Sequence, residues 1–214
     1  MADDYLGRKM EEYMSRPAAS RPRPSVKLHE LLVRNRSHRN YDAGFIVRED
    51  QLRRIIAVNP LIPSALNRQA LRFRPVLSDE ASKITPLVRL GGALPELHLP
   101  QEGCEPNAYI VVCAATAEDR YLDIDLGISA QSMLLQAVEI GLNGICIASF
   151  DKEAVREALN LELEPLLILA IGRGKDNIEL VDIGADGDRR YYRRDRKHFV
   201  PKVVTDDLII GKKR

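Results

Sequence analysis

One stretch of the chain, residues 121–142, most constrains the fold. It has the spacing of a helix and is apolar almost all round, with small residues Gly127, Ala130, Ala137 and Gly141 along it. A helix without a polar face must be buried on more than one side. In a chain of 214 residues, we expect it to pack on its own sheet and also against a second copy of the chain. Burial wholly inside one subunit is the alternative.

Several apolar runs predict the strands on which this helix packs. The runs at 108–114, 144–150 and 165–172 are nearly continuous, which is typical of strands covered on both faces. Residues 73–77 predict a further strand, and residues 177–183 predict one at a sheet edge. No strand is followed by G-x-G-x-x-G, which argues against a nicotinamide-binding Rossmann domain.

Shorter helices are expected between the strands. Asp151 is a good N-cap for a helix over 152–159, and Ser64 is a candidate N-cap for one over 65–71. Residues 93–106 are rich in Pro and Gly and predict a loop. The remaining helices are expected over 26–33, 48–59 and 79–92.

The N-terminal part predicts an arm outside the single domain formed by residues 26–214. Residues 1–15 have the spacing of an amphipathic helix, and residues 16–25 carry three prolines that prevent its continuation. Residues 1–25 are therefore interpreted as an arm with a Pro-rich linker. The arm either packs on another surface, such as a partner subunit, or is a loosely attached tail.

Composition excludes several functional classes. The net charge of +1 does not indicate a general nucleic-acid or anionic-membrane surface, and no apolar run reaches the roughly 18 residues of a membrane helix. Three widely spaced cysteines and an acidic N-terminus without a signal-peptide pattern favour the cytoplasm. The four histidines lack metal-ligand spacing, so no metal is expected. Nucleic-acid binding through the basic run 189–198 is the alternative that the composition disfavours.

The first candidate binding site is the basic stretch 34–42. Arg36, Ser37 and Arg39 place two guanidinium groups and a hydroxyl within four residues. Guanidinium forks match phosphate oxygens, and a serine hydroxyl adds a short donor. The stretch predicts an anion site, and a solvated basic turn is the alternative interpretation.

Three segments in one order then resemble the flavin-dependent nitroreductase family. NRSHRNY at 35–41 is similar to R-R-S-x-R-x-[FY], and PSALNRQALRF at 63–73 is similar to P-S-[AS]-x-N-x-Q-P-W-x-F. DLGISAQSMLL at 125–135, continuing to Leu142, is similar to D-x-G-x-A-x-Q-x-[ML]-L-L-x-A-x-x-x-G-L. The resemblance covers roughly residues 28–210 and implies an α+β fold. That fold is an α/β/α sandwich with a mixed, mainly antiparallel sheet, in an intertwined homodimer with FMN at the subunit interface.

The resemblance also implies residues for the cofactor. Arg36, Ser37 and Arg39 match positions that hold the phosphate and ribityl chain. Lys202 matches a late basic residue on the phosphate, a role for which Arg193, Arg194 and Arg196 compete. The segment expected to come from the partner subunit and lie along the flavin contains Pro63, Ser64, Ala65 and Asn67. The segment expected beside the flavin ring near N5 contains Cys146, Ile147, Ala148 and Ser149.

By the same resemblance, the chain is an oxidoreductase with FMN as cofactor and NADH or NADPH as reductant. Hydride would pass through the flavin to a nitroaromatic, a quinone or a similar small oxidant, with no side chain as catalytic acid or base. The chain departs from the family at Ala70-Leu71, where Pro-Trp is expected, and at Ala148, where some members have glutamate. These departures leave open a flavin-binding sensor or carrier with little turnover.

Overall fold

The computed structural model describes residues 27–92 and 97–211. The arm and Pro-rich linker predicted within residues 1–25 lie outside the described residues and stay predictions. Within the described part of the chain, no helix is long and apolar enough to cross a membrane.

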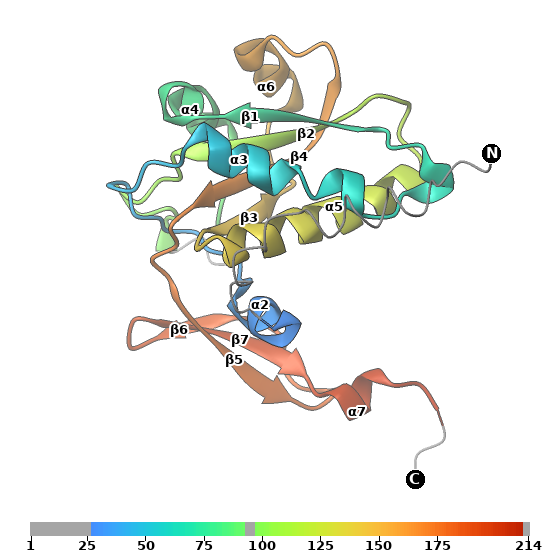
Figure 1. The fold of residues 1–214 in the computed structure, drawn as a ribbon. Helices are drawn as coiled ribbons and strands as arrows, with labels where there is room; N and C mark the ends of the chain where they lie inside the picture. The colour runs from blue at the N-terminus through green and yellow to red at the C-terminus, as the bar shows by residue number, and fades with distance from the viewer. Residues whose placement is uncertain (1–26, 93–96, 212–214) are drawn as a thin grey trace, which may run out of the picture.

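A four-stranded sheet forms the centre of the fold (Figure 1). It consists of β1 (Leu71–Val76), β2 (Ala108–Ala114), β3 (Asn143–Ile147) and β4 (Glu164–Gly172), in the order β1-β2-β4-β3. Each neighbouring pair is antiparallel. All residues of β2 are buried, which confirms the prediction of a strand covered on both faces.

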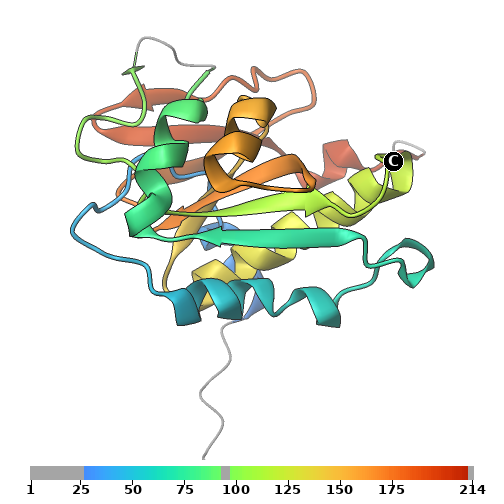
Figure 2. The ribbon, with the colours of Figure 1, turned by 90° about the horizontal axis from the view of Figure 1, so that it is seen from above.

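Helices cover both faces of this sheet (Figure 2). On one face, α3 (Glu49–Ile56) and α5 (Arg120–Glu139) pack against inward-facing residues such as Ile110 and Val112. On the other, α4 (Ser78–Ile84) and α6 (Lys152–Leu159) pack against Tyr109, Val111 and Cys113. Successive residues of β2 thus enter two different cores. The predicted α/β/α sandwich is confirmed.

A smaller sheet follows the end of β4 and projects away from the main sheet (Figure 1). In it, β5 (Asn177–Ile183) runs parallel to β7 (Lys197–Val203), and β6 (Tyr192–Arg194) is antiparallel to β7. The predicted edge position of β5 is correct. The remaining helices are α2 (Leu28–Arg34) and the short α7 (Thr205–Leu208).

Helix α5 confirms the predicted long helix, with Asp119 as its N-cap. Its inner face packs on the sheet, and its outer face leaves Tyr121 58% exposed and Ile124 49% exposed. The expected burial of this face against a second copy stays a prediction, because a single chain does not test it.

The helix predicted over 65–71 is wrong. Only a three-residue 3₁₀ turn, η2 (Ala65–Asn67), follows Ser64, and β1 starts at Leu71. Leu66 and Asn67 have φ values of 51° and 53°, which lie in the left-handed region and cannot continue a right-handed helix. The Ser64 hydroxyl accepts a hydrogen bond from the Gln69 N–H at 3.2 Å instead of capping a helix.

Three other predicted elements are shorter in the structure. The helix predicted over 79–92 ends at Ile84 and passes into the 3₁₀ turn η3 (Thr85–Leu87), because Pro86 lacks the N–H that a helix needs. The helix predicted over 48–59 ends at Ile56, before the 3₁₀ turn η1 (Asn59–Leu61). The strand predicted over 144–150 stops at Ile147.

Candidate functional site

A pocket of about 340 Å³ lies where the basic stretch meets β3, α5 and the small sheet. Such a volume is within the range of small-molecule sites. The basic stretch and main fold contribute Asn35, Arg36, Ser37, Arg39, Gln131, Leu134, Gly144 and Cys146. The small sheet and its loops contribute Ile178, Tyr191, His198, Val200 and Lys202.

Backbone pairing holds the basic stretch in place on two sides. Ser37 forms a parallel bridge with Gly144, at the start of β3. On the other side, Tyr41 forms an antiparallel bridge with Gly174, and the Asp42 N–H donates to the Arg173 carbonyl at 2.8 Å. The stretch is therefore an ordered segment between the ends of two strands and not a solvated turn.

The two predicted arginines keep donors available in this pocket. The Arg36 Nη2 donates to the Leu32 carbonyl at 2.6 Å, and the Arg39 Nη1 donates to the Ser37 carbonyl at 3.1 Å. The Nε of each is buried without a hydrogen-bond partner among the described residues. Since a guanidinium carries five N–H donors, these contacts leave several free for an anion. Burial lowers the pKa of Arg36 from its usual value.

The small sheet adds basic and aromatic groups. The Tyr191 and His198 rings lie 5.1 Å apart, and the Arg39 guanidinium lies 5.1 Å from the centre of the Tyr191 ring. Among the competing late basic residues, Lys202 lines the pocket, while Arg193 pairs with Asp176.

The other two candidates lie outside the pocket. Arg194 is positioned over the Phe199 ring at 5.4 Å. Arg196 is exposed.

Two buried histidines belong to this region. His38 and His198 are 7% and 3% exposed, and neither Nδ1 has a partner in the described part of the chain. Burial lowers the pKa of both imidazoles, and nearby arginines lower it further, against the opposing effect of Asp176. Both rings are therefore neutral near pH 7, and the arginines and Lys202 supply the positive charge.

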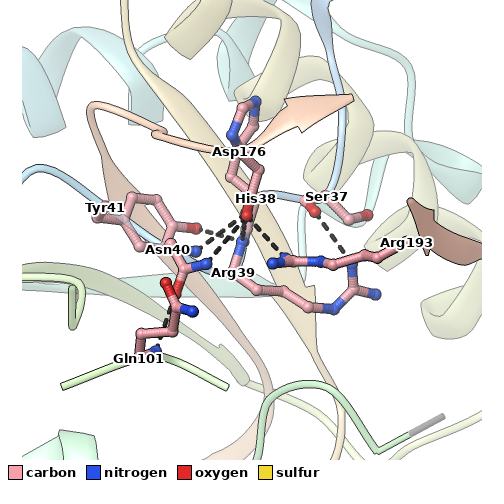
Figure 3. A network of polar contacts seen from close by, with 8 residues as sticks. All are labelled: Ser37, His38, Arg39, Asn40, Tyr41, Gln101, Asp176 and Arg193. Atoms are coloured by element: carbon pink, nitrogen blue, oxygen red, sulfur yellow. Dashed lines mark hydrogen bonds and ion pairs between the residues drawn. The ribbon is translucent and has the colours of Figure 1, made fainter. Parts of the chain in front are cut away.

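A carboxylate beside the pocket connects these segments (Figure 3). Asp176 accepts hydrogen bonds from the backbone N–H groups of Arg39 and Asn40, from the Asn40 amide and from Arg193. Sequence reasoning missed Asp176, Asn40, Tyr191 and His198. The only signal for Asp176 was its position in the short connection between the strands predicted at 165–172 and 177–183.

The predicted site residues of 63–67 lie elsewhere in the chain. Pro63 and Ser64 line a second pocket, of about 920 Å³, which shares no lining residue with the first. The Ala65 N–H donates to both carboxylate oxygens of Asp125, at 2.9 and 3.2 Å. The Asn67 amide oxygen accepts from the Gln69 side chain at 3.0 Å.

The predicted segment 146–149 straddles the end of β3. Cys146 is exposed and lines the first pocket, whereas Ile147 is 3% exposed and belongs to the core. Ala148 and Ser149 follow the strand and are exposed. One chain thus brings together Arg36, Ser37, Arg39, Cys146 and Lys202 in one pocket, and leaves the other predicted residues outside it.

The first pocket has the chemistry of an anion site. It presents guanidinium and ammonium donors, and none of its lining residues is a carboxylate. Fork-shaped donors of this kind fit phosphate oxygens. Among the residues that the structure describes, no three His, Cys, Asp or Glu side chains gather as a metal-ligand set.

Comparison with known proteins points to one family. The Nitroreductase family matches residues 101–173. A nitroreductase family protein from Clostridium difficile 630 has 25% identity and a TM-score of 0.57, with 71% of this chain and 86% of that chain covered. No curated protein matches the chain.

Two further solved structures share the fold. A candidate nitroreductase from Exiguobacterium sibiricum 255-15, in complex with FMN, has 20% identity and a TM-score of 0.58, with 72% of this chain and 91% of that chain covered. An FMN and NADPH-dependent nitroreductase from Sphigopyxis sp. strain HMH has 18% identity and a TM-score of 0.60, with coverages of 70% and 89%. Over residues 101–173 the chain is thus similar to the nitroreductase family, and its fold is the fold of nitroreductase family proteins.

Proposed function

We propose that the chain is an FMN-dependent oxidoreductase that acts as a homodimer. When bound, FMN takes hydride from NADH or NADPH and passes it to a nitroaromatic, a quinone or a similar small oxidant. The observation that carries the proposal is the single pocket lined by Arg36, Ser37, Arg39 and Lys202, which has no carboxylate among its lining residues.

The phosphate end of FMN fits these residues. A phosphate monoester carries close to two negative charges at neutral pH. The contacts to the Leu32 and Ser37 carbonyls each use one terminal Nη group, so Arg36 and Arg39 keep other Nη donors for phosphate oxygens. These free donors support the assignment of the two arginines and Ser37 to the phosphate and ribityl chain.

The ring end of FMN is assigned to the segment 146–149. The exposed Cys146 lies in the same pocket as the arginines, and Ala148 and Ser149 continue from it beyond the end of β3. Main-chain N–H groups at such a strand end can stabilise negative charge on a reduced ring. The chain's part is thus to hold the phosphate, orient the ring and exclude water from one side, without an acid or base.

We assign the remaining side of the flavin site to a second subunit. Pro63, Ser64, Ala65 and Asn67 share no pocket with the arginines of their own chain. Their loop carries Leu66, which is 92% exposed, and the nearby outer face of α5 leaves Tyr121 and Ile124 exposed. Large exposed apolar side chains that gather in this way are typical of protein interfaces. We therefore assign this loop to the flavin of a partner subunit.

The relatives support FMN and a reduced nicotinamide as the two redox partners. One similar structure contains FMN, and another is an FMN and NADPH-dependent nitroreductase. The runner-up function, a flavin-binding sensor or carrier, is favoured by Ala70-Leu71 and Ala148, which provide no large aromatic wall and no carboxylate near the ring.

Rapid-mixing reduction separates the two functions. The protein as purified is first examined for the absorbance of bound flavin and saturated with FMN if needed. It is then mixed with NADH or NADPH without oxygen. Fast bleaching by either donor, followed by recovery on addition of a quinone, supports the oxidoreductase. Bound flavin that neither donor reduces contradicts it and favours the sensor or carrier.

A double variant tests the phosphate assignment. Arg36→Ala together with Arg39→Ala should give folded but colourless protein, because the pocket loses both forks. Lys152→Ala with Arg156→Ala is the matched control, since it removes two positive charges from α6, on the opposite face of the sheet. Stoichiometric FMN in the first variant would refute the assignment.

A further inference from the structure

We propose that Asp176 is a positioning residue that sets the arginines of the pocket for phosphate and so makes the site select FMN over riboflavin. The inference rests on the proposed function, because it concerns the same pocket. Asp176 does not line the pocket itself and acts through the residues that it holds.

The first step concerns the hydrogen bonds that Asp176 accepts from the basic stretch. Its Oδ2 accepts the Arg39 N–H at 2.6 Å and the Asn40 N–H at 3.0 Å, and its Oδ1 accepts the Asn40 amide at 3.0 Å (Figure 3). Two consecutive backbone donors on one oxygen fix the direction in which the chain passes residue 39. The Arg39 side chain leaves the backbone at this point and reaches the pocket.

The second step is the link to the small sheet. The Arg193 Nη2 donates to Asp176 Oδ1 at 2.8 Å, and the side chains of this pair are 24% and 5% exposed. Arg193 belongs to β6, which pairs with the strand that contributes His198 and Lys202. One carboxylate therefore joins the basic stretch to the sheet that supplies the other side of the pocket.

The third step concerns the charge state of this carboxylate. Burial opposes the charged form, but the Arg39 and Asn40 backbone donors, with Arg193, outweigh it and keep the pKa of Asp176 below its usual value. A buried carboxylate with this number of donors stays ionised near neutral pH, and it therefore keeps its hydrogen bonds to the basic stretch and to Arg193.

Because Asp176 is negatively charged, a positioning role and simple electrostatic repulsion predict opposite changes in FMN affinity when its charge is removed. A negative group close to a phosphate pocket repels the ligand, so loss of its charge alone should strengthen FMN binding. Loss of a positioning residue should weaken FMN binding, because Arg39 and the small sheet are no longer held. Riboflavin lacks the phosphate and shares only the ribityl chain and the ring with FMN, so its affinity should respond far less to either effect.

The experiment compares FMN and riboflavin affinities of wild type and Asp176→Asn by flavin-fluorescence titration, with folding checked by circular dichroism. We expect FMN affinity to fall about 10- to 100-fold, the scale of charge-assisted hydrogen bonds, while riboflavin affinity stays within about twofold. If Asp176 had only a structural role, Asp176→Asn would lower the melting temperature and leave the ratio of FMN affinity to riboflavin affinity unchanged. An unchanged ratio, or tighter FMN binding, in folded Asp176→Asn would overturn the proposal.

Two further variants complete the test. Arg193→Lys keeps the positive charge but loses the planar guanidinium, and it should also lower the ratio of FMN affinity to riboflavin affinity. This variant tests the proposal even if Asp176→Asn does not fold. Asp188→Asn is the control, because it removes the same charge from an exposed ion pair with Arg190. An equal fall of the ratio in this control would overturn the positioning role. Wild type that binds FMN no better than riboflavin would overturn the proposed phosphate site itself.

Discussion

The imidazole ring of His38 occupies the space that a side chain on Gly174 would need. A Cβ at residue 174 would overlap three ring atoms, and His38, within the basic stretch, is buried. Gly174→Ala should therefore displace His38 and the adjoining Arg39. We expect a loss of about 1–3 kcal/mol in the free energy of unfolding, as for other overpacked sites, measured by urea denaturation, together with weaker FMN binding.

Gly184→Ala provides the matched control. A Cβ there has Asp207 as its nearest neighbour at 3.5 Å, an ordinary contact. Its free energy of unfolding should stay within about 0.5 kcal/mol of wild type. Equal stability of the Gly174 and Gly184 variants would contradict the close packing of His38.

The two buried histidines predict a pH dependence of stability. Burial and neighbouring arginines hold the pKa of His38 and His198 below the ordinary value of 6.5. Between about 6.5 and these lowered values, the unfolded chain binds protons that the folded chain does not. The flavin-free protein should thus lose stability as the pH falls from 7 to 5, by at most about 1.4 kcal/mol per pH unit for each imidazole.

Urea denaturation at a series of pH values measures this slope. His198→Gln and His38→Gln should each flatten it, whatever their effect on stability at pH 7. His29→Gln, on the exposed surface of α2, is the control and should follow the wild-type curve. Stability that rises on acidification would contradict the prediction.

Local patterns in the sequence predicted much of the fold, because the interactions behind them are local. Asp151 accepts the Ala154 N–H at 2.9 Å as an N-cap, and the apolar run 108–114 forms the central strand. The helix predicted after Ser64 failed because Leu66 has a left-handed backbone, which nothing in its residue type indicates.

The candidate site was predictable only in part for the same reason. Arg36 and Arg39 stand within one motif, and both line the same pocket, whereas their role in binding a cofactor stays a prediction. Asp176 contacts Arg39 from 137 positions away in the chain. No spacing rule connects such residues, since the contact depends on how β4 leaves the sheet and turns toward the basic stretch.

Cys146 offers a chemical test of the ring assignment. It is exposed in the pocket, whereas Cys113 is buried and Cys104 is intermediate. Desolvation raises the pKa of the Cys146 thiol, so its labelling by a disulfide reagent should be slow at pH 7 and faster at higher pH. FMN should block this labelling, which mass spectrometry of the labelled peptides can follow.

The control for this labelling is Cys104→Ser, which should leave the FMN-protected reaction intact. Riboflavin should protect as well, since protection depends on the ring and not on the phosphate. Labelling of Cys146 at the same rate with and without saturating FMN would remove this residue from the site.

The last prediction tests whether two chains share each site. Asp125, in α5, accepts a hydrogen bond from the Ala65 N–H of the loop 63–67, and this residue is 5% exposed. Asp125→Ala leaves that N–H without its acceptor and should loosen the loop, at a cost of about 1–3 kcal/mol. If the loop contacts the flavin of the partner subunit, a dimer of two Asp125→Ala chains binds FMN weakly at both sites. A dimer of two Arg36→Ala, Arg39→Ala chains does the same.

A mixed dimer of the two variants then has one intact site. The Asp125→Ala chain supplies its arginines, the arginine-deficient chain supplies its loop, and the other site carries both defects. Differently tagged chains, coexpressed and purified through both tags, should therefore bind about one FMN per dimer, while each parent dimer binds almost none. Mixed dimers as colourless as the parents would mean that arginines and loop act on the same chain, and a wild-type monomer in light scattering would exclude sharing altogether.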